Sequence, residues 1–384
     1  MPRIRVPTPG SQPASSTVQA VDVYKSAGVD YEALDAAKRA AGAAALSTSH
    51  LLAARGGRAV DESRGEPAFV FTMGETALAM VLECLGTKSI IAREFEEAGG
   101  SAHYDDVAYD TVAAIVNDLC CVGALPLVVN AYFATGDGGW YGQGKRLTSL
   151  VEGWRRGCVD AGATWGGGES PTLASLVSDE DIELAGCAVG HVPIEIDPIL
   201  GDRLAAGNEI ILLASSGLHA NGASIARRVA ADSPAGFNTR LESGALLGDA
   251  VLAPSIMYAP LIADLLGLGI VPTYISHITG HGFRKLMRAR GDFVYRIRTL
   301  PKVPEVLSFL VKHSDMDARA AYGTFNMGAG MALFCRPKDS DRILERARAC
   351  GLEPLRAGEV ESGTRSVVLE PLDITFASED LSLR

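Results

Sequence analysis

The spacing of apolar residues predicts helices and strands in the first half of the chain. Apolar positions recur at helical intervals over residues 106–119, and residues 31–46 and 147–161 are also expected to be helical. Apolar runs predict a strand at residues 125–133 and another, buried on both faces, at residues 182–192. Helices that alternate with strands indicate an α/β or α+β domain.

Three neighbouring stretches near the start are less regular. Residues 53–67 have no clear period and are interpreted as a loop, whereas residues 67–73 favour a short strand. Residues 78–85 are apolar, but their pattern fits a helix or a strand equally well.

The second half repeats one arrangement, in which a strand runs into a Gly-rich loop and then a helix. It occurs first at residues 208–214, with the loop at 215–222 and the helix at 223–231. It occurs again at residues 271–275, with the loop at 276–282 and a helix from Phe283. The start of a helix after such a loop is a ready anion site, so both loops are expected to bind anions.

The length of 384 residues indicates two domains, each able to bury its own core. Residues 193–207 contain prolines and glycines and form the expected boundary, which divides residues 21–195 from 196–384. Residues 1–20 are rich in Pro, Ser and Thr and are interpreted as a disordered lead-in.

Composition narrows the function classes. A hydrophobic content of 47% with 21% charged residues is typical of a soluble globular protein. No apolar run approaches a membrane span and no signal-peptide pattern begins the chain, so we expect a cytoplasmic protein without a membrane partner. Seven scattered cysteines without a CxxC pair indicate reduced thiols. The net charge of −11 argues against nucleic acid as a partner.

The segment Gly167-Gly168-Glu169-Ser170 is a candidate phosphate and metal corner. Glycines let the backbone turn tightly toward an anion, and the carboxylate of Glu169 could hold a cation beside it. A plain loop is the alternative interpretation of so short a motif.

Four acids, each beside small or apolar residues, are candidate metal ligands. Each could form a local cap or ion pair, but together they would offer the oxygen-rich pocket that Mg²⁺ prefers, shared with the phosphates of a nucleotide. These acids are Glu83, Asp110, Asp118 and Glu169. Lys88, which follows Gly86 and Thr87, could supply the positive charge for a transferring phosphate. The sequence has no GxSxG elbow, which would indicate a hydrolase. It also has no GxGxxG after a strand, which would indicate a dinucleotide site.

The ordered motifs resemble the aminoimidazole ribonucleotide synthetase family, the phosphoribosylformylglycinamidine cyclo-ligases. The resemblance extends over about residues 23–335 and is carried by short segments of sequence. They are Tyr24 to Asp30, Asn117-Asp118-Leu119, Gly123 to Pro126, Ala134-Thr135-Gly136, Gly167 to Ser170, Ser215-Ser216-Gly217, Asn221-Gly222, Leu252-Ala253-Pro254, His277 to Gly280 and Thr324 to Gly328.

The resemblance implies two α/β (α+β) domains, each a mixed sheet covered by helices, and a homodimer that pairs the sheets of its N-terminal domains. It implies ATP and Mg²⁺ as cofactors and an ATP-dependent ring closure on a small-molecule amide. The N-terminal domain would bind ATP and form the dimer. Catalytic roles would fall to Lys88, Asp118 and Glu169, and metal binding to Glu83, Asp110, Asp118 and Glu169. Nucleotide-binding roles would fall to Lys25, Gly86, Thr87, Asn117, Gly167, Gly168, Ser170, His219, Asn221, Thr279, Gly280, His281 and Asn326.

The chain also departs from the family pattern. Glu83 stands where the family has Asp, and His281 replaces the middle glycine of the His-Leu-Thr-Gly-Gly-Gly loop. Three functions therefore remain open: formation of aminoimidazole ribonucleotide, the same amide activation on another substrate, and nucleotide binding without catalysis.

Overall fold

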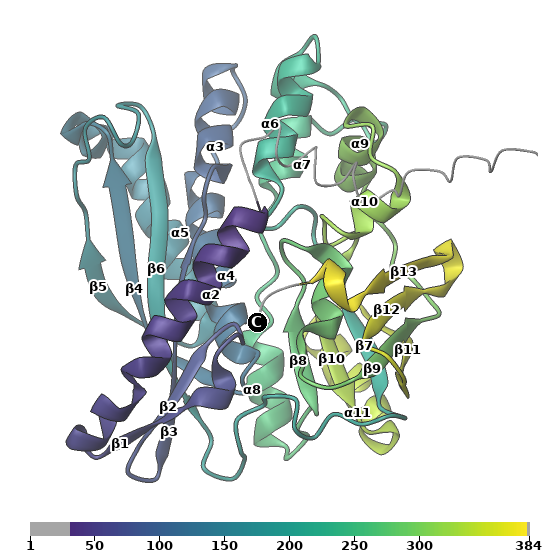
Figure 1. The fold of residues 1–384 in the computed structure, drawn as a ribbon. Coiled ribbons are helices and arrows are strands. Elements are labelled where there is room, and N and C mark those ends of the chain that lie inside the picture. Colours follow the sequence, from purple (N-terminus) through teal and green to yellow (C-terminus); the bar gives the residue numbers. More distant parts are fainter. Residues whose placement is uncertain (1–30, 382–384) are drawn as a thin grey trace, which may run out of the picture.

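A computed structural model describes residues 31–381 and contains two β-sheets that stand side by side (Figure 1). The first sheet is built from the first half of the chain and the second sheet from the second half. The lead-in over residues 1–20 and Lys25 lie outside the described residues.

The first sheet has six strands in the order β1-β2-β3-β6-β4-β5. Its strands are β1 (Gly57–Val60), β2 (Phe69–Met73), β3 (Thr76–Cys84), β4 (Leu125–Thr135), β5 (Thr164–Glu169) and β6 (Ile182–Val192). The helices of this half are α2 (Tyr31–Ser47), α3 (Lys88–Glu97), α4 (Tyr104–Cys120) and α5 (Gly144–Ala161). The predicted helices and the strands β4 and β6 are confirmed to within a few residues at their ends.

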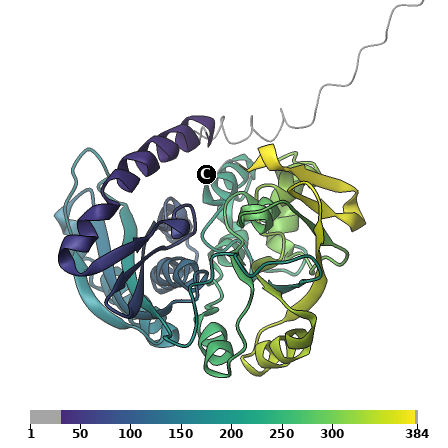
Figure 2. The same ribbon diagram turned by 60° about the horizontal axis from the view of Figure 1, so that its bottom comes forward.

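Helix α4 forms the centre of this half because its apolar residues recur at helical spacing. Its Val112, Ile115, Val116 and Leu119 are fully buried between the sheet and the neighbouring helices. The helices cover one face of the sheet, and α2 extends away from it along the molecule (Figure 2).

The opposite face of the six-stranded sheet is open in the single chain. Strand β6 alternates strictly between buried and half-buried residues, so the prediction that both of its faces are buried is wrong. On the adjacent β3, Met80 is 44% and Leu82 71% exposed, whereas Ala79 and Val81 face the helices. We call the face that carries Met80, Leu82 and Cys84 the open face.

The predicted loop over residues 53–67 is wrong in part. It contains the end of a 3₁₀ turn at Ser49–Arg55, strand β1 and a second 3₁₀ turn at Asp61–Ser63. A four-residue strand is too short to show a period, and its position depends on pairing with β2, from Gly57 opposite Met73 to Val60 opposite Val70. Residues 78–84 of the undecided stretch 78–85 belong to strand β3.

The second sheet has seven strands in the order β13-β12-β9-β11-β7-β10-β8. Its strands are β7 (Glu209–Ala214), β8 (Tyr274–His277), β9 (Phe293–Ile297), β10 (Ala329–Cys335), β11 (Pro354–Ser362), β12 (Ser366–Leu369) and β13 (Ile374–Ala377). The helices are α6 (Ala223–Asp232), α7 (Leu247–Leu252), α8 (Ala259–Gly267), α9 (Glu305–His313), α10 (Ala318–Tyr322) and α11 (Pro337–Ala349).

The two Gly-rich loops meet at one edge of this sheet. Strands β7 and β8 both pair antiparallel to β10, so they run parallel to each other. The loops that follow them therefore leave from the same ends of the strands. The second strand lies later than the predicted 271–275. The helix predicted from Phe283 is a 3₁₀ segment, Gly282–Arg288, with a non-helical residue at Met287.

Polar contacts between buried groups fix the two halves against each other. Lys88 at the start of α3 forms a fully buried ion pair with Asp110 of α4 and donates to the carbonyl of His219 in the second half, 2.9 Å away. Asp110 in turn accepts a 2.6 Å hydrogen bond from the backbone N–H of Ser255.

A second contact between the halves is formed by His103. Its ring nitrogens lie 2.8 Å from Asp106 and 2.9 Å from Asp249 of α7. The hydrogen bond with Asp106 is the largest cause of a raised pKa for His103, and Asp249 raises it further.

Within residues 31–381, no helix is both long and apolar enough to span a bilayer.

Candidate active site

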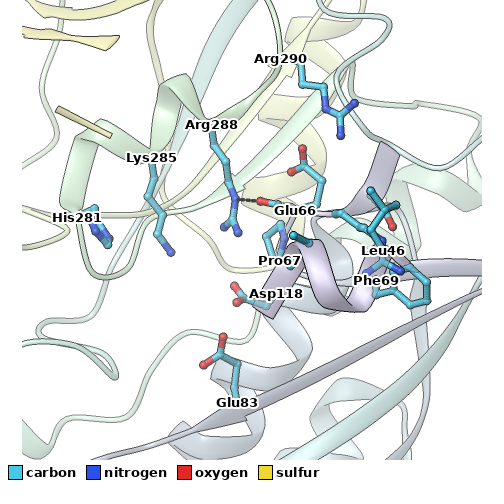
Figure 3. A pocket seen from close by; sticks show the side chains of 15 residues that line it. Leu46, Glu66, Pro67, Phe69, Glu83, Asp118, His281, Lys285, Arg288 and Arg290 are labelled. Carbon is cyan, nitrogen blue, oxygen red and sulfur yellow. Dashed lines mark hydrogen bonds between the residues drawn. The ribbon is translucent and has the colours of Figure 1, made fainter. Parts of the chain in front are cut away.

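Four side chains from both halves converge where the sheets face each other. Glu83, the last residue but one of β3, lies on the helix-covered face next to Asp118, near the end of α4. His277 ends β8, and its Nδ1 lies 2.6 Å from Oδ1 of Asp118. Lys285 comes from the 3₁₀ segment and points toward the two carboxylates (Figure 3). We call Glu83, Asp118, His277 and Lys285 the central cluster.

Burial and charge set the protonation of the central cluster. Burial opposes ionisation of Asp118, but the hydrogen bond and charge of His277, with Lys285 and Arg288, outweigh it and hold the pKa of Asp118 at about 2. Burial raises the pKa of Glu83 to about 7, and the negative charge of Asp118 adds to this effect. Burial also lowers the pKa of Lys285, as does nearby Arg288. One carboxylate is thus firmly ionised beside one that can accept a proton near neutrality.

A cavity of about 340 Å³, which we call the loop cavity, opens on one side of the central cluster. Both Gly-rich loops line it, through Ala220 and Asn221 of the first and Thr279 and Gly280 of the second. Gly86, which has the left-handed φ of 68°, closes it from the first half. Of the predicted nucleotide-binding residues, the structure therefore brings together Gly86, Asn221, Thr279, Gly280 and His281 at this cavity.

A cavity of about 960 Å³, which we call the large cavity, opens on the other side of the cluster (Figure 3). It shares Glu83, Asp118, His281 and Lys285 with the loop cavity, so the two cavities meet at these side chains. Its other walls come from α2, from residues 63–69 and from Arg288 and Arg290.

The segment Gly167–Ser170 does not join this site within one chain, which corrects the predicted corner. It is the end of edge strand β5 and the residue after it, rather than a tight turn. The row from Gly168 through Ala131 and Gly186 to Glu83 spans three strand spacings, or about 14 Å.

Glu169 also points the wrong way to join the other acids. It pairs with Tyr132, whose row continues to Cys84 on the open face, whereas Glu83 faces the helices. A metal ion shared by Glu83 and Glu169 within one chain is therefore excluded.

Lys88 and Asp110 also lie outside both cavities. Each side chain is fully buried and holds the other, so the predicted contact of Lys88 with a transferring phosphate and of Asp110 with a metal is not supported by the geometry. The local sequence could not show this, because the pair joins residues 22 positions apart and is completed by His219 and Ser255. Thr87 precedes α3 and makes no side-chain cap.

Three other predicted ligand residues have structural partners. Asn117 donates to the carbonyl of Ile256 and accepts from the N–H of Tyr258, both at 2.9 Å. Asn326 accepts from Ser215 and donates to the carbonyl of Gly217, so it holds the first Gly-rich loop in shape.

His219 likewise supports the first Gly-rich loop, since its Nε2 accepts a 3.1 Å hydrogen bond from the N–H of Ser216. Burial lowers the pKa of His219 to about 3, and the charges of His277 and Lys88 add to this, so the ring is neutral.

The side chains of the site could hold Mg²⁺ only if a bound ligand supplied part of its coordination. Within residues 31–381, no group of three or more His, Cys, Asp or Glu side chains is placed to hold a metal ion. Glu83 and Asp118 offer two carboxylates, and Mg²⁺ is commonly held by one or two carboxylates, water and substrate phosphates.

The sequence analysis missed the cations of the large cavity. Lys285, Arg288 and Arg290 follow the second Gly-rich loop within eight residues. Only the kink at Met287 and the packing of this segment against residues 62–66 turn them into the cavity.

Comparison with known proteins places the chain in a family. The profile of the AIR synthase related protein N-terminal domain matches residues 65–192, and that of the C-terminal domain matches residues 205–370. A phosphoribosylformylglycinamidine cyclo-ligase of Lachnospira eligens is 33% identical over 270 residues, which cover 69% of this chain and 78% of that protein. One from Methanothermobacter thermautotrophicus is 32% identical over 77% of this chain and 86% of that protein.

The fold also resembles that of solved structures. The hydrogenase maturation protein HypE in complex with ATP superimposes with a TM-score of 0.56 at 15% identity, covering 78% of this chain and 83% of that one. Both halves, their order and their sheets thus have counterparts in these proteins. The chain belongs to the AIR synthase related family.

Proposed function

We propose that this protein is an ATP-dependent cyclo-ligase that converts formylglycinamidine ribonucleotide to aminoimidazole ribonucleotide. The relatives that bear this activity in their names cover most of the chain. The observation that carries the proposal is the meeting of two cavities at Glu83, Asp118, His281 and Lys285. A phosphoryl donor and an acceptor could reach each other there without sharing a pocket.

In this proposal the loop cavity takes the phosphates of ATP. The Gly-rich loops after β7 and β8 would present backbone N–H groups and Thr279 to them, and Lys285 would face the transferring phosphate. Bound Mg²⁺ would be held by Asp118 and Glu83 and would offset charge on the phosphates.

The acceptor amide would enter from the large cavity. Transfer of the γ-phosphoryl group to the amide oxygen breaks the terminal phosphoanhydride bond and releases ADP. The amidine nitrogen then attacks the activated carbon and phosphate leaves with the former amide oxygen. The proton that the attacking nitrogen loses would leave with the departing phosphate.

The assay that tests this function follows ADP and the imidazole product together, with formylglycinamidine ribonucleotide, ATP and Mg²⁺. We expect both products in equal amounts. Bound ATP without either product would reject this reaction.

A second candidate keeps the amide activation but changes the acceptor. It is favoured by His281, whose left-handed φ of 74° places a side chain at the meeting point of the cavities where the family pattern has glycine. ADP release with another amide and none with formylglycinamidine ribonucleotide would select it. Tight ATP binding without turnover of any amide would favour a binding protein without catalysis.

We also propose that two copies pair through the open face. Met80 and Leu82 stand exposed side by side on this face, and clustered exposed apolar side chains mark surfaces that other proteins cover. Glu169 and the end of β5 stand on the same face, so they would come close to the partner.

Leu82→Asp is expected to convert the dimer to a monomer at micromolar concentration, because pairing would then bury two unpaired charges. Light scattering measures the mass. The matched control is Val159→Asp, which places the same charge on α5, where Val159 is 62% exposed. A wild-type monomer would contradict the pairing.

A further inference from the structure

We infer that His281 is a specificity-determining residue that limits the size of the acyl group at the reacting end of the acceptor, so that a formyl amide is accepted and larger acyl amides are rejected. This inference rests on the proposed function, in which an amide oxygen is phosphorylated at the junction of the two cavities. It assigns the choice between acyl groups to one side chain.

His281 stands where the phosphoryl donor and the acceptor would meet. Of residues 31–381, four line both cavities, and three of them, Glu83, Asp118 and Lys285, belong to the central cluster. His281 is the fourth, and Figure 3 shows it beside Lys285. Transfer of a phosphoryl group from one cavity to the other would bring the acyl group of the acceptor against this ring.

The backbone of His281 has a conformation that favours glycine. Its φ of 74° and ψ of 0° lie in the left-handed region, where a side chain is unfavourable. At the next residue, Gly282, packing requires glycine, because a Cβ there would lie 2.2 Å from the carbonyl oxygen of Tyr322. At position 281 glycine would relieve the strain, so the histidine is explained by its side chain. Strained residues of this kind gather at active sites and ligand-binding sites.

Hydrogen bonds on both sides hold this strained backbone in place. The N–H of Gly282 donates to the carbonyl of Thr279 at 3.0 Å, and the carbonyl of His281 accepts from the N–H and the Nε of Arg284, both at 3.2 Å. Arg284 is itself anchored, since its Nη2 donates to the carbonyl of Gly323 at 2.6 Å. A shift of the loop would break these bonds, so the half-buried ring forms a firm boundary of the junction.

A firm boundary at the reacting end discriminates between acyl groups by size. A formyl group carries a hydrogen on its carbonyl carbon, whereas an acetyl group carries a methyl group there. One carbon more or less in a fitted pocket changes specificity about 10- to 200-fold. An acetyl group would have to displace the ring of His281 or stay farther from the phosphates in the loop cavity.

The test is a calorimetric titration of the full-length protein with formylglycinamidine ribonucleotide and with its N-acetyl analogue, in the presence of Mg²⁺ and a non-hydrolysable ATP analogue. We expect the wild type to bind the formyl compound at least about tenfold more tightly than the acetyl compound. In His281→Gly this ratio should fall to about threefold or less, because the acetyl compound gains affinity. His281→Asn, which tolerates the left-handed backbone and has a smaller side chain, should give an intermediate ratio.

The matched control is Asp373→Gly, which relieves another left-handed φ, of 53°, at an exposed residue that lines neither cavity. It should keep the wild-type ratio. Thermal unfolding separates selection of the acceptor from a packing role, since His281→Gly should unfold at or above the wild-type temperature once the strain is relieved. A clearly lower unfolding temperature would show that the ring serves packing and would overturn the inference.

The outcomes distinguish the inference from the proposed function. Equal binding of the two compounds by the wild type, or an unchanged ratio in His281→Gly, would overturn the size limit even if the wild type forms the imidazole product. A ratio that depends on His281, without ADP or imidazole product in the assay with ATP, would keep the size limit and reject the reaction. Binding of neither compound would reject both.

Discussion

Replacing Lys88 by methionine should lower the free energy of unfolding by about 3–5 kcal/mol, since it leaves one half of a buried ion pair without its partner. Both side chains of the Lys88–Asp110 pair are fully buried. In the variant, Asp110 would keep only the N–H of Ser255 as a hydrogen-bond donor, and the carbonyl of His219 would lose the Lys88 ammonium. The contact between the two halves should weaken with it.

Urea denaturation of the variant measures this effect, with Lys145→Met as the control. Lys145 lies in the first turn of α5, as Lys88 does in α3, but it is exposed. The double variant Lys88→Met/Asp110→Leu should recover part of the lost stability, because it removes both buried charges. Unchanged stability with abolished turnover would restore Lys88 to the catalytic role predicted from the sequence.

The sequence predicted the parts of the fold that depend on local periodicity. Helix α4 was recognised by the spacing of its apolar residues and strands β4 and β6 by their apolar runs. The two Gly-rich loops were found because each lies between an apolar run and a predicted helix. Strand β1 and the shift of β8 were missed, because short strands are positioned by their partners rather than by their own sequence.

The sequence predicted only part of the site, from residue type and position in the chain. Asp118, Glu83 and the loop residues Asn221 and Thr279 do line the cavities. The roles of Lys88 and Asn117 depend on atoms that lie about 130 to 140 residues away in the sequence, such as the carbonyls of His219 and Ile256. No spacing along one strand or helix carries that information. Glu169 was grouped with the other acids by residue type, while the alternation of strand faces turns it away from them.

Asp118→Asn should reduce turnover about 100- to 1,000-fold, the loss typical of removing one preorganised charge at a reaction centre. Asp118 is the ionised carboxylate at the meeting point of both cavities, held by His277 at 2.6 Å. Asparagine has the shape of the aspartate side chain but lacks the negative charge that would bind Mg²⁺ and face Lys285. Simultaneous assay of ADP and imidazole product measures the effect.

The pH dependence of this loss separates a charge effect from misfolding. The pKa of Asp118 in the folded protein is held at about 2, below its ordinary value near 3.8. The ionised carboxylate therefore stabilises the fold fully above about pH 3.8, and this stabilisation is lost as the pH falls toward 2. Between about pH 6 and 8 Asp118 stays ionised in the wild type, and its charge helps to raise the pKa of Glu83 to about 7, so the pH profile of turnover should shift to lower pH in Asp118→Asn. Asp105→Asn, in the first turn of the same helix and paired with Arg156, should keep wild-type turnover. Full activity of Asp118→Asn would contradict the placement of the reaction centre at the junction of the two cavities.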